Sequence, residues 1–304
     1  MYPFEVLIHG PFDDFKSDAR MVPTDNAHCM FSVNDYEDGH WRYGKFYEFI
    51  WDNIKETALS AKERTALFGS EGRIISRAAK KLRITNHDIA GGEIAEIFLY
   101  GVMKHYYGAL PVVPKIFYKQ NRNDYVKGAD SVHIVIELEG KISLWLGEAK
   151  FYNGVENDRL GEIVDSVFDT LDTQKIRKEN SIITNVQDIN HLNLPEEIKT
   201  EIEELLSEDR SIDLLKPHLH IPIMILFESP LTERTTSYTE EYKKEIIAYY
   251  KERAEAYLKK QLDKCKDRVH DYDKITFHIM LFPVPDKTKI VQDFINTANA
   301  HRIS

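Results

Sequence analysis

Two β-rich runs separated by a short break most constrain what this 304-residue chain can fold into. Residues 131–137 and 142–148 are rich in valine, isoleucine and leucine, and Leu138-Glu139-Gly140 lies between them. A three-residue hairpin loop commonly has glycine in its third position, because that position adopts the left-handed conformation. The sequence therefore predicts a β-hairpin in which Glu137 faces Lys141.

This register places the apolar pairs of the hairpin on one face and charged residues at the end of that face. Side chains alternate along a strand, so residues of even number share a face here. The apolar pairs are Val132 with Leu146, Ile134 with Leu144, and Ile136 with Ile142. The same register puts Asp130 opposite Glu148, and Lys150 follows two residues later on that face. An apolar strip that ends in two carboxylates and an amine needs a chemical explanation.

A divalent cation provides one, since neighbouring carboxylates repel each other unless a positive charge lies between them. Mg²⁺ binds one or two carboxylates together with phosphate and water, and Mn²⁺ accepts the same oxygen ligands. A lysine beside the metal can position the attacking water or stabilise developing negative charge. The residues thus indicate a metal site with Asp130 and Glu148 as ligands and Lys150 as a catalytic group. The alternative is an exposed hairpin end with solvated charges.

The Asp…Glu-x-Lys pattern resembles the PD-(D/E)xK nuclease superfamily. Ala129-Asp130 stands for the "PD" and Glu148-Ala149-Lys150 for the "ExK". The proline is replaced by alanine, at a position that is loosely kept in the superfamily. The resemblance implies a magnesium-dependent nuclease and makes the Ala149 carbonyl a candidate metal ligand.

Residues 91–107 predict a well-buried helix, because their apolar side chains surround the helix axis. Glu93 and Glu96 share one face of this helix, and buried charges usually have partners. The superfamily resemblance implies that a glutamate from the helix before the sheet joins the metal site. Glu96 is the better candidate, since Glu93 is near the helix start and can favour the helix dipole. A structural ion pair is the alternative for either residue.

The remaining pattern predicts an α/β fold in which helices and strands follow one another. We expect irregular structure over 1–44 with one strand near 4–9. Helices are expected over 45–68, with Ser60 capping a second short helix, and over 71–83, 156–178, 195–207 and 239–266. Strands are expected over 111–118, 221–228 and 274–282. Between the first of these strands and Asp130, a loop carries Lys119, Arg122 and Lys127 as candidate DNA contacts, although an ordinary polar loop explains them equally well.

The predicted order of helix, strand, hairpin, helix and buried strand agrees with the αβββαβ core of the PD-(D/E)xK fold, with helical elaborations at both termini. We divide the chain into an N-terminal elaboration over 1–68, a nuclease-like core over 69–230, and a C-terminal helix and strand over 231–304. The segments Gly-Gly-Glu-Ile-Ala-Glu, Lys-Gly-Ala-Asp-Ser and Leu-Gly-Glu-Ala-Lys-Phe-Tyr resemble the HamA family, the nuclease subunits of Hachiman anti-phage defence systems. This resemblance implies a DNA-degrading effector with a helicase partner, HamB.

Composition limits the function classes further. The chain has no long apolar run and no signal-peptide pattern, so we expect a cytoplasmic protein with no membrane contact. Two cysteines are too few for a disulfide framework. A net charge of −10 disfavours unaided nucleic-acid binding over the whole surface but allows a local basic groove. We expect a metal-dependent nuclease regulated by a helicase; the alternative is a catalytically silent module of nuclease fold that binds a partner or nucleic acid.

Overall fold

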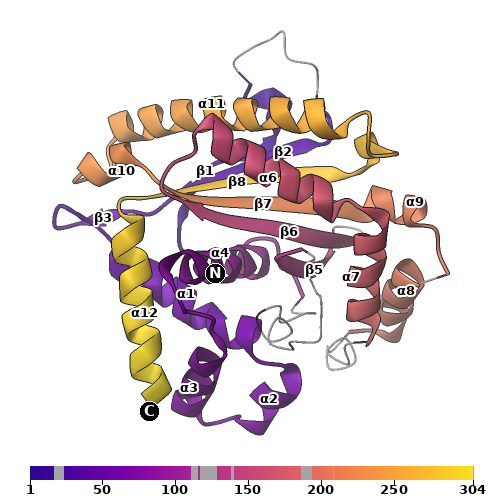
Figure 1. Cartoon of the computed structure of the whole chain (residues 1–304), viewed down its shortest axis with the longest axis horizontal. Helices are drawn as coiled ribbons and strands as arrows, with labels where there is room; N and C mark the ends of the chain where they lie inside the picture. Colours follow the sequence, from indigo (N-terminus) through magenta and orange to yellow (C-terminus); the bar gives the residue numbers. More distant parts are fainter. Residues whose placement is uncertain are drawn as a thin grey trace.

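Six strands form a central mixed sheet in the order β1-β2-β8-β7-β6-β5 (Figure 1). The computed structural model describes residues 1–16, 24–110, 116, 129–137, 140–185, 194–207 and 209–303, without the side chains of 182–185. The outer pairs β1/β2 and β5/β6 are antiparallel, and the inner strands are parallel. The strands are β1 (Glu5–Pro11), β2 (Ala27–Val33), β5 (Ser131–Ile136), β6 (Ile142–Tyr152), β7 (Leu219–Glu228) and β8 (Thr276–Val284), with a separate small hairpin of β3 (Tyr36–Glu37) and β4 (His40–Trp41).

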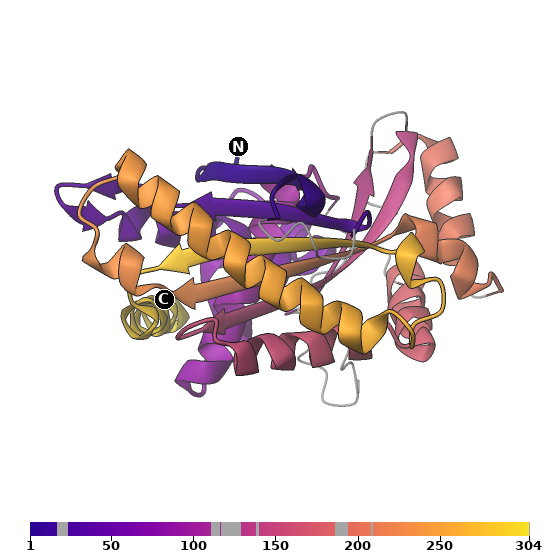
Figure 2. The ribbon, with the colours of Figure 1, turned by 90° about the horizontal axis from the view of Figure 1, so that it is seen from above.

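Helices cover both faces of the sheet, as the two buried faces of its inner strands require. Figure 1 shows α6 and α11 on one side and α1, α4 and α12 on the other, and Figure 2 shows α11 running across the strands. Each side has its own apolar core. The helices are α1 (Tyr43–Ala58), α2 (Ala61–Ala66), α3 (Glu71–Lys81), α4 (His87–His105), α6 (Asn157–Thr170), α7 (Thr173–Asn185), α8 (Glu196–Leu206), α9 (Ile212–Leu215), α10 (Pro230–Arg234), α11 (Glu240–Cys265) and α12 (Lys287–Ile303).

The predicted hairpin register is confirmed. Val132 pairs with Leu146, Ile134 with Leu144 and Ile136 with Ile142. The Glu137 N–H donates to the Lys141 carbonyl over 2.8 Å, and Gly140 has a φ of +80°, the left-handed conformation for which glycine is suited. The even-numbered residues of the hairpin belong to the core under α6 and α11, whereas Val135, Trp145 and Ala149 belong to the core under α4.

Two expectations about the elements were wrong. The segment 1–44 is not irregular apart from one strand, because β2 lies inside the sheet between β1 and β8. Both faces of β2 are covered, so its residues do not alternate between apolar and polar. The predicted helix 156–178 is two helices, α6 and α7, because the Asp172 carboxylate accepts the N–H groups of Gln174 and Lys175 and thereby begins a new helix.

The other predicted helices and strands within the described residues agree with the structure to within a few residues, and Ser60 forms a capping box with Glu63. The short elements β3, β4, α9 and α10 were not predicted. Helix α12, which packs against α3 and α4, was not predicted either. The predicted strand 111–118 lies outside the described residues apart from Ile116, which is helical. The αβββαβ core therefore stays a prediction. Strands from all three predicted segments share one sheet: β1 and β2 come from 1–68, β8 from 231–304, and the rest from 69–230.

Candidate metal centre

The structure brings Asp130, Glu148 and Lys150 together at the edge of the sheet. The Lys150 Nζ atom lies 3.1 Å from Asp130 Oδ2 and 3.4 Å from Glu148 Oε2. Asp130 continues the hairpin ladder by one residue, since its N–H donates to the Gly147 carbonyl over 2.8 Å. Its Oδ2 atom also accepts the Ala149 N–H over 3.1 Å. The hairpin register therefore places these three charged groups in contact, as the sequence predicts.

The Glu148 carboxylate is buried under α6 and is held there by two hydroxyl groups. Ser166 Oγ donates to Oε2 over 2.7 Å, and Thr170 Oγ1 donates to Oε1 over 2.6 Å. Ser166 and Thr170 are one helical turn apart, so both hydroxyls reach the same carboxylate. Neither residue was predicted to belong to the site. The sequence does place two polar residues beside the apolar stripe of α6. Only the packing of α6 on β6 shows that they contact Glu148.

The pKa values of Glu148 and Lys150 are both raised, but for different reasons. Burial raises the pKa of Glu148, and the neighbouring Asp130 charge raises it further, against the opposing effects of Lys150 and the two hydroxyls. Burial alone would lower the pKa of Lys150, but Asp130 and Glu148 outweigh it and raise that pKa above its ordinary value. Lys150 is thus a fixed cation, and it supplies one positive charge to two carboxylates.

The donor set fits a hard divalent cation. Both carboxylates contact the same Lys150 Nζ atom, and carboxylate oxygens are the ligands that Mg²⁺ and Mn²⁺ prefer. Burial, and then the Asp130 charge, raise the pKa of Glu148, and a bound cation would favour its ionised form. Asp130 and Glu148 would hold the ion. That the Ala149 carbonyl is a further metal ligand stays a prediction.

The two helical glutamates have different positions. Both oxygens of Glu93 accept the Arg83 N–H at 2.8 Å, and Glu93 is 2% exposed. Glu93 therefore holds the backbone just after α3 in place. This is a structural role, as the alternative to metal binding expects. Glu96 is half-buried on α4, the helix on the sheet face opposite α6. Its contribution to the metal site stays a prediction.

Close contacts between α4 and β6 fix the level of Glu96 along the sheet. A Cβ atom at Gly147 would lie 2.7 Å from Leu99 Cδ2, and one at Gly91 would lie 3.9 Å from Phe151 Cδ1. Glu96 lies between these two contacts along α4. It is therefore at the same level of β6 as Glu148, but on the other face of the sheet.

Other predicted or potential sites do not add to this centre. Lys119, Arg122 and Lys127, the candidate DNA contacts, lie outside the described residues. Asp213, His270 and Asp271 place ligand atoms within 4.8 Å of one another. Lysine partners already neutralise both carboxylates, over 2.8 Å to Asp213 and 2.9 Å to Asp271, so this group is explained by ion pairs.

Among the described helices, none combines the length and the apolar composition that a membrane span requires.

Comparison with known proteins identifies the family of this chain. A search among curated proteins found no match to this sequence. The family model HamA matches residues 10–298, which is nearly the whole chain and includes every residue of the site. The chain belongs to the HamA family.

Proposed function

We propose that this protein is a metal-dependent nuclease of the PD-(D/E)xK type that cleaves DNA as an effector of a Hachiman anti-phage defence system. The observation that carries the proposal is the convergence of Asp130, Glu148 and Lys150 at the end of the β5–β6 hairpin. Membership of the HamA family supports the defence context. The proposal gives each of the three residues a separate task.

Asp130 and Glu148 would bind Mg²⁺ or Mn²⁺. The bound ion would polarise the scissile phosphate and lower the pKa of an attacking water. Lys150 stays protonated because of the two carboxylates, so it would donate hydrogen bonds to the negative charge that develops on the phosphate oxygens. Ser166 and Thr170 would keep the Glu148 carboxylate oriented. Glu96 is a further candidate on the opposite face of the sheet.

The decisive experiment incubates labelled DNA and RNA with the protein in Mg²⁺, in Mn²⁺ and in EDTA. Glu148→Gln and Lys150→Met should each reduce DNA cleavage on the order of a thousandfold, since each removes several kcal/mol of transition-state stabilisation. Lys264→Met is a matched control, because Lys264 also pairs with a carboxylate, Asp165, but at a half-buried position on α11 outside the site. Cleavage by both site variants at the wild-type rate would contradict the assignment.

The same experiment separates the enzyme from a catalytically silent binding module of nuclease fold. A silent module would show no metal-dependent cleavage in the wild type, and Glu148→Gln would then leave its binding of partner or nucleic acid unchanged. The intact Asp130, Glu148 and Lys150 contacts favour the enzyme, because a binding module has no need to keep two carboxylates against each other.

We further propose that a helicase partner, HamB, regulates the nuclease. The net charge of −10 disfavours DNA at long range, so a DNA-translocating partner would supply affinity and restraint. Coexpression with the helicase and size-exclusion chromatography test this directly. A chain that stayed monomeric in that mixture and degraded DNA equally well with and without the helicase would exclude the regulatory role. The N-terminal segment 1–68 and the C-terminal segment 231–304 contribute strands to the central sheet. The outward faces of these two segments would be available for docking of the helicase.

A further inference from the structure

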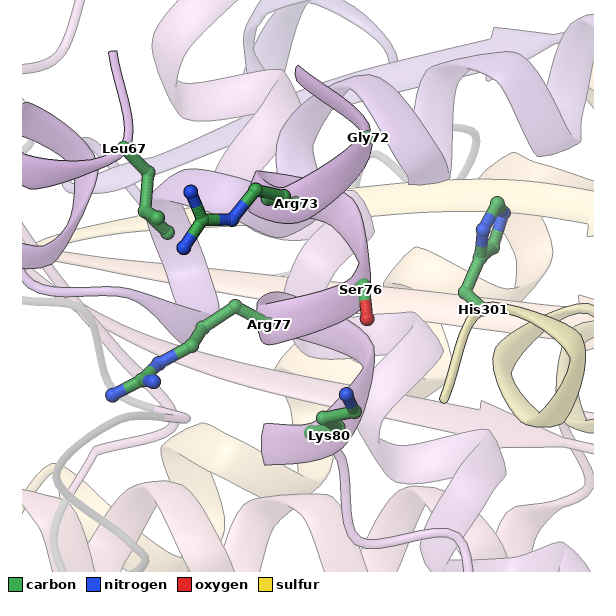
Figure 3. Close-up of a pocket in the computed structure, with 7 residues that line it drawn as sticks. All are labelled: Leu67, Gly72, Arg73, Ser76, Arg77, Lys80 and His301. Atoms are coloured by element: carbon green, nitrogen blue, oxygen red, sulfur yellow. The ribbon is translucent and has the colours of Figure 1, made fainter. Parts of the chain in front are cut away.

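A basic pocket lies on α3, on the side of the molecule away from α6 (Figures 1 and 3). Its cavity has a volume of about 510 Å³, which is within the range of small-ligand sites. Six of the lining residues belong to α3 or the turn before it, and one comes from the end of α12. The lining residues of this α3 pocket are Leu67, Gly72, Arg73, Ser76, Arg77, Lys80 and His301.

Three cations line the pocket, and among the described residues only one of the three pairs with a carboxylate. Arg73, Arg77 and Lys80 are exposed and follow one another by about one helical turn. Arg77 lies 3.3 Å from the Glu63 carboxylate. Within the described part of the chain, neither Arg73 nor Lys80 has a carboxylate partner. In a chain with a net charge of −10, two such cations on one helix face indicate an anionic ligand.

The walls of the pocket are held in place by contacts between α3 and α12. The Arg302 guanidinium donates to the Ala79 carbonyl, in the last turn of α3, over 3.0 Å, and to the carbonyl of Leu82, the residue after α3. The preceding His301 ring lies 5.1 Å from the ring of Trp51 on α1. Three helices therefore fix the positions from which the basic side chains extend.

An exposed aromatic residue directly follows one of the pocket residues in the sequence. Phe68 follows the pocket residue Leu67 and is 92% exposed, whereas a phenylalanine with only a packing role would be covered. A basic groove with an exposed aromatic ring is the arrangement that binds single-stranded nucleic acid, since the cations contact phosphates and a base stacks on the ring. An acidic peptide would use the cations but would have no particular need for the ring.

We propose that the α3 pocket binds a segment of single-stranded nucleic acid, with phosphates at Arg73 and Lys80 and a base on Phe68. Arg73 and Lys80 are about 10 Å apart along the helix axis, so their long side chains reach two phosphates of one strand. The pocket is on the opposite side of the sheet from the Glu148 carboxylate, and it therefore anchors strand outside the reacting position. The biological meaning rests on the proposed nuclease function, although the binding itself does not.

The test measures fluorescence anisotropy of a labelled 15-nucleotide oligothymidine with the full chain in EDTA, over a series of salt concentrations. Arg73→Gln/Lys80→Gln should weaken binding at least about tenfold at low salt and reduce the salt slope by about 1.4, because each contact with a single strand contributes about 0.7. Phe68→Ala should weaken binding about tenfold with the slope unchanged, since it removes stacking but no charge. Lys244→Gln/Lys259→Gln is the matched control: it removes the same charge from exposed positions on α11.

The outcomes separate this inference from the proposed function. Equal affinities and slopes for the α3 variant and the α11 control, or no binding by the wild type, would overturn the inference even if the wild type cleaves DNA. Specific loss of binding in the α3 variant would support it even if no divalent ion produces cleavage. If thymidine mononucleotide displaces the labelled oligothymidine as well as unlabelled strand does, the ligand is a nucleotide and not a strand. If poly-glutamate does so, the ligand is an acidic protein and not a nucleic acid. Thermal unfolding of each variant verifies the fold.

Discussion

The hydrogen bond from Thr170 to Glu148 offers a sharp test of how the site is built. The hydroxyl lies 2.6 Å from a carboxylate oxygen, and both residues are at most 5% exposed. Thr170→Val keeps the branched shape of the side chain, so it removes the hydrogen bond without opening a cavity. A hydrogen bond to a charged group contributes about 1.5–3 kcal/mol, and we expect the free energy of unfolding to fall by about 2 kcal/mol.

The assay is urea-induced unfolding at pH 7.5, with DNA cleavage measured on the same preparations. Cleavage by Thr170→Val should fall about tenfold, because Ser166 still holds the other oxygen of Glu148 while misplacement of a catalytic group is costly. Thr57→Val is the matched control. Its hydroxyl is equally buried but donates only to carbonyls of its own helix, at Asn53 and Ile54, so its loss should cost less than about 1 kcal/mol.

A double-mutant cycle assigns the effect to the pair. In a Glu148→Gln background, Thr170→Val should cost about half as much, because the acceptor is no longer charged. If Thr170→Val were as stable as Thr57→Val and cut DNA at the wild-type rate, the two hydroxyls would have no part in orienting Glu148, and the role given to α6 would be wrong.

Three further perturbations test the fold around the site. Glu148→Gln should raise the midpoint of thermal unfolding in EDTA and lose any stabilisation by Mn²⁺ that the wild type shows. Gly147→Ala should lower stability by about 2 kcal/mol or more, because its Cβ would lie 2.7 Å from Leu99, whereas Gly161→Ala on α6 meets open space and should not destabilise. In the Glu148→Gln variant, which lacks the opposing effect of the raised Glu148 pKa, acid should remove about 4 kcal/mol between pH 7.5 and 5.5. Three buried histidines have lowered pKa values and stay neutral in the folded state, while the unfolded chain takes up protons below about pH 6.5. Burial lowers the pKa of His133 and of His220 to about 3, and it lowers the pKa of His278 well below its usual value. Urea unfolding at several pH values measures this loss, and a flat profile would contradict it.

The hairpin and its three charged residues could be predicted because all the information is local. Alternation along two strands and one glycine in the loop fix the register, and the register alone brings Asp130 to Glu148 and Lys150. The short helix that begins after Ser60 was predictable for the same reason, since a capping box is complete within four residues.

The partners of these residues could not be predicted, because they come from distant segments. Ser166 and Thr170 reach Glu148 only because α6 returns across β6. Glu93 contacts the Arg83 N–H ten residues earlier, a pairing that helix periodicity cannot reveal. The strand β2 was missed for a related reason. Its two buried faces remove the alternation by which a strand is recognised, and its neighbour β8 follows some 240 residues later.

The site combines tight packing with unfavourable charge. On one face of β6, Leu99 of α4 lies so close to Gly147 that no side chain fits there, and on the other face α6 covers Glu148. A carboxylate whose pKa is raised by burial and by Asp130 opposes folding at neutral pH, because the unfolded chain ionises it more easily. Packing from both faces therefore has to hold together a pair of carboxylates that would separate in water. An arrangement that costs stability at one point is expected where function requires it, and a divalent cation bound there would offset the cost.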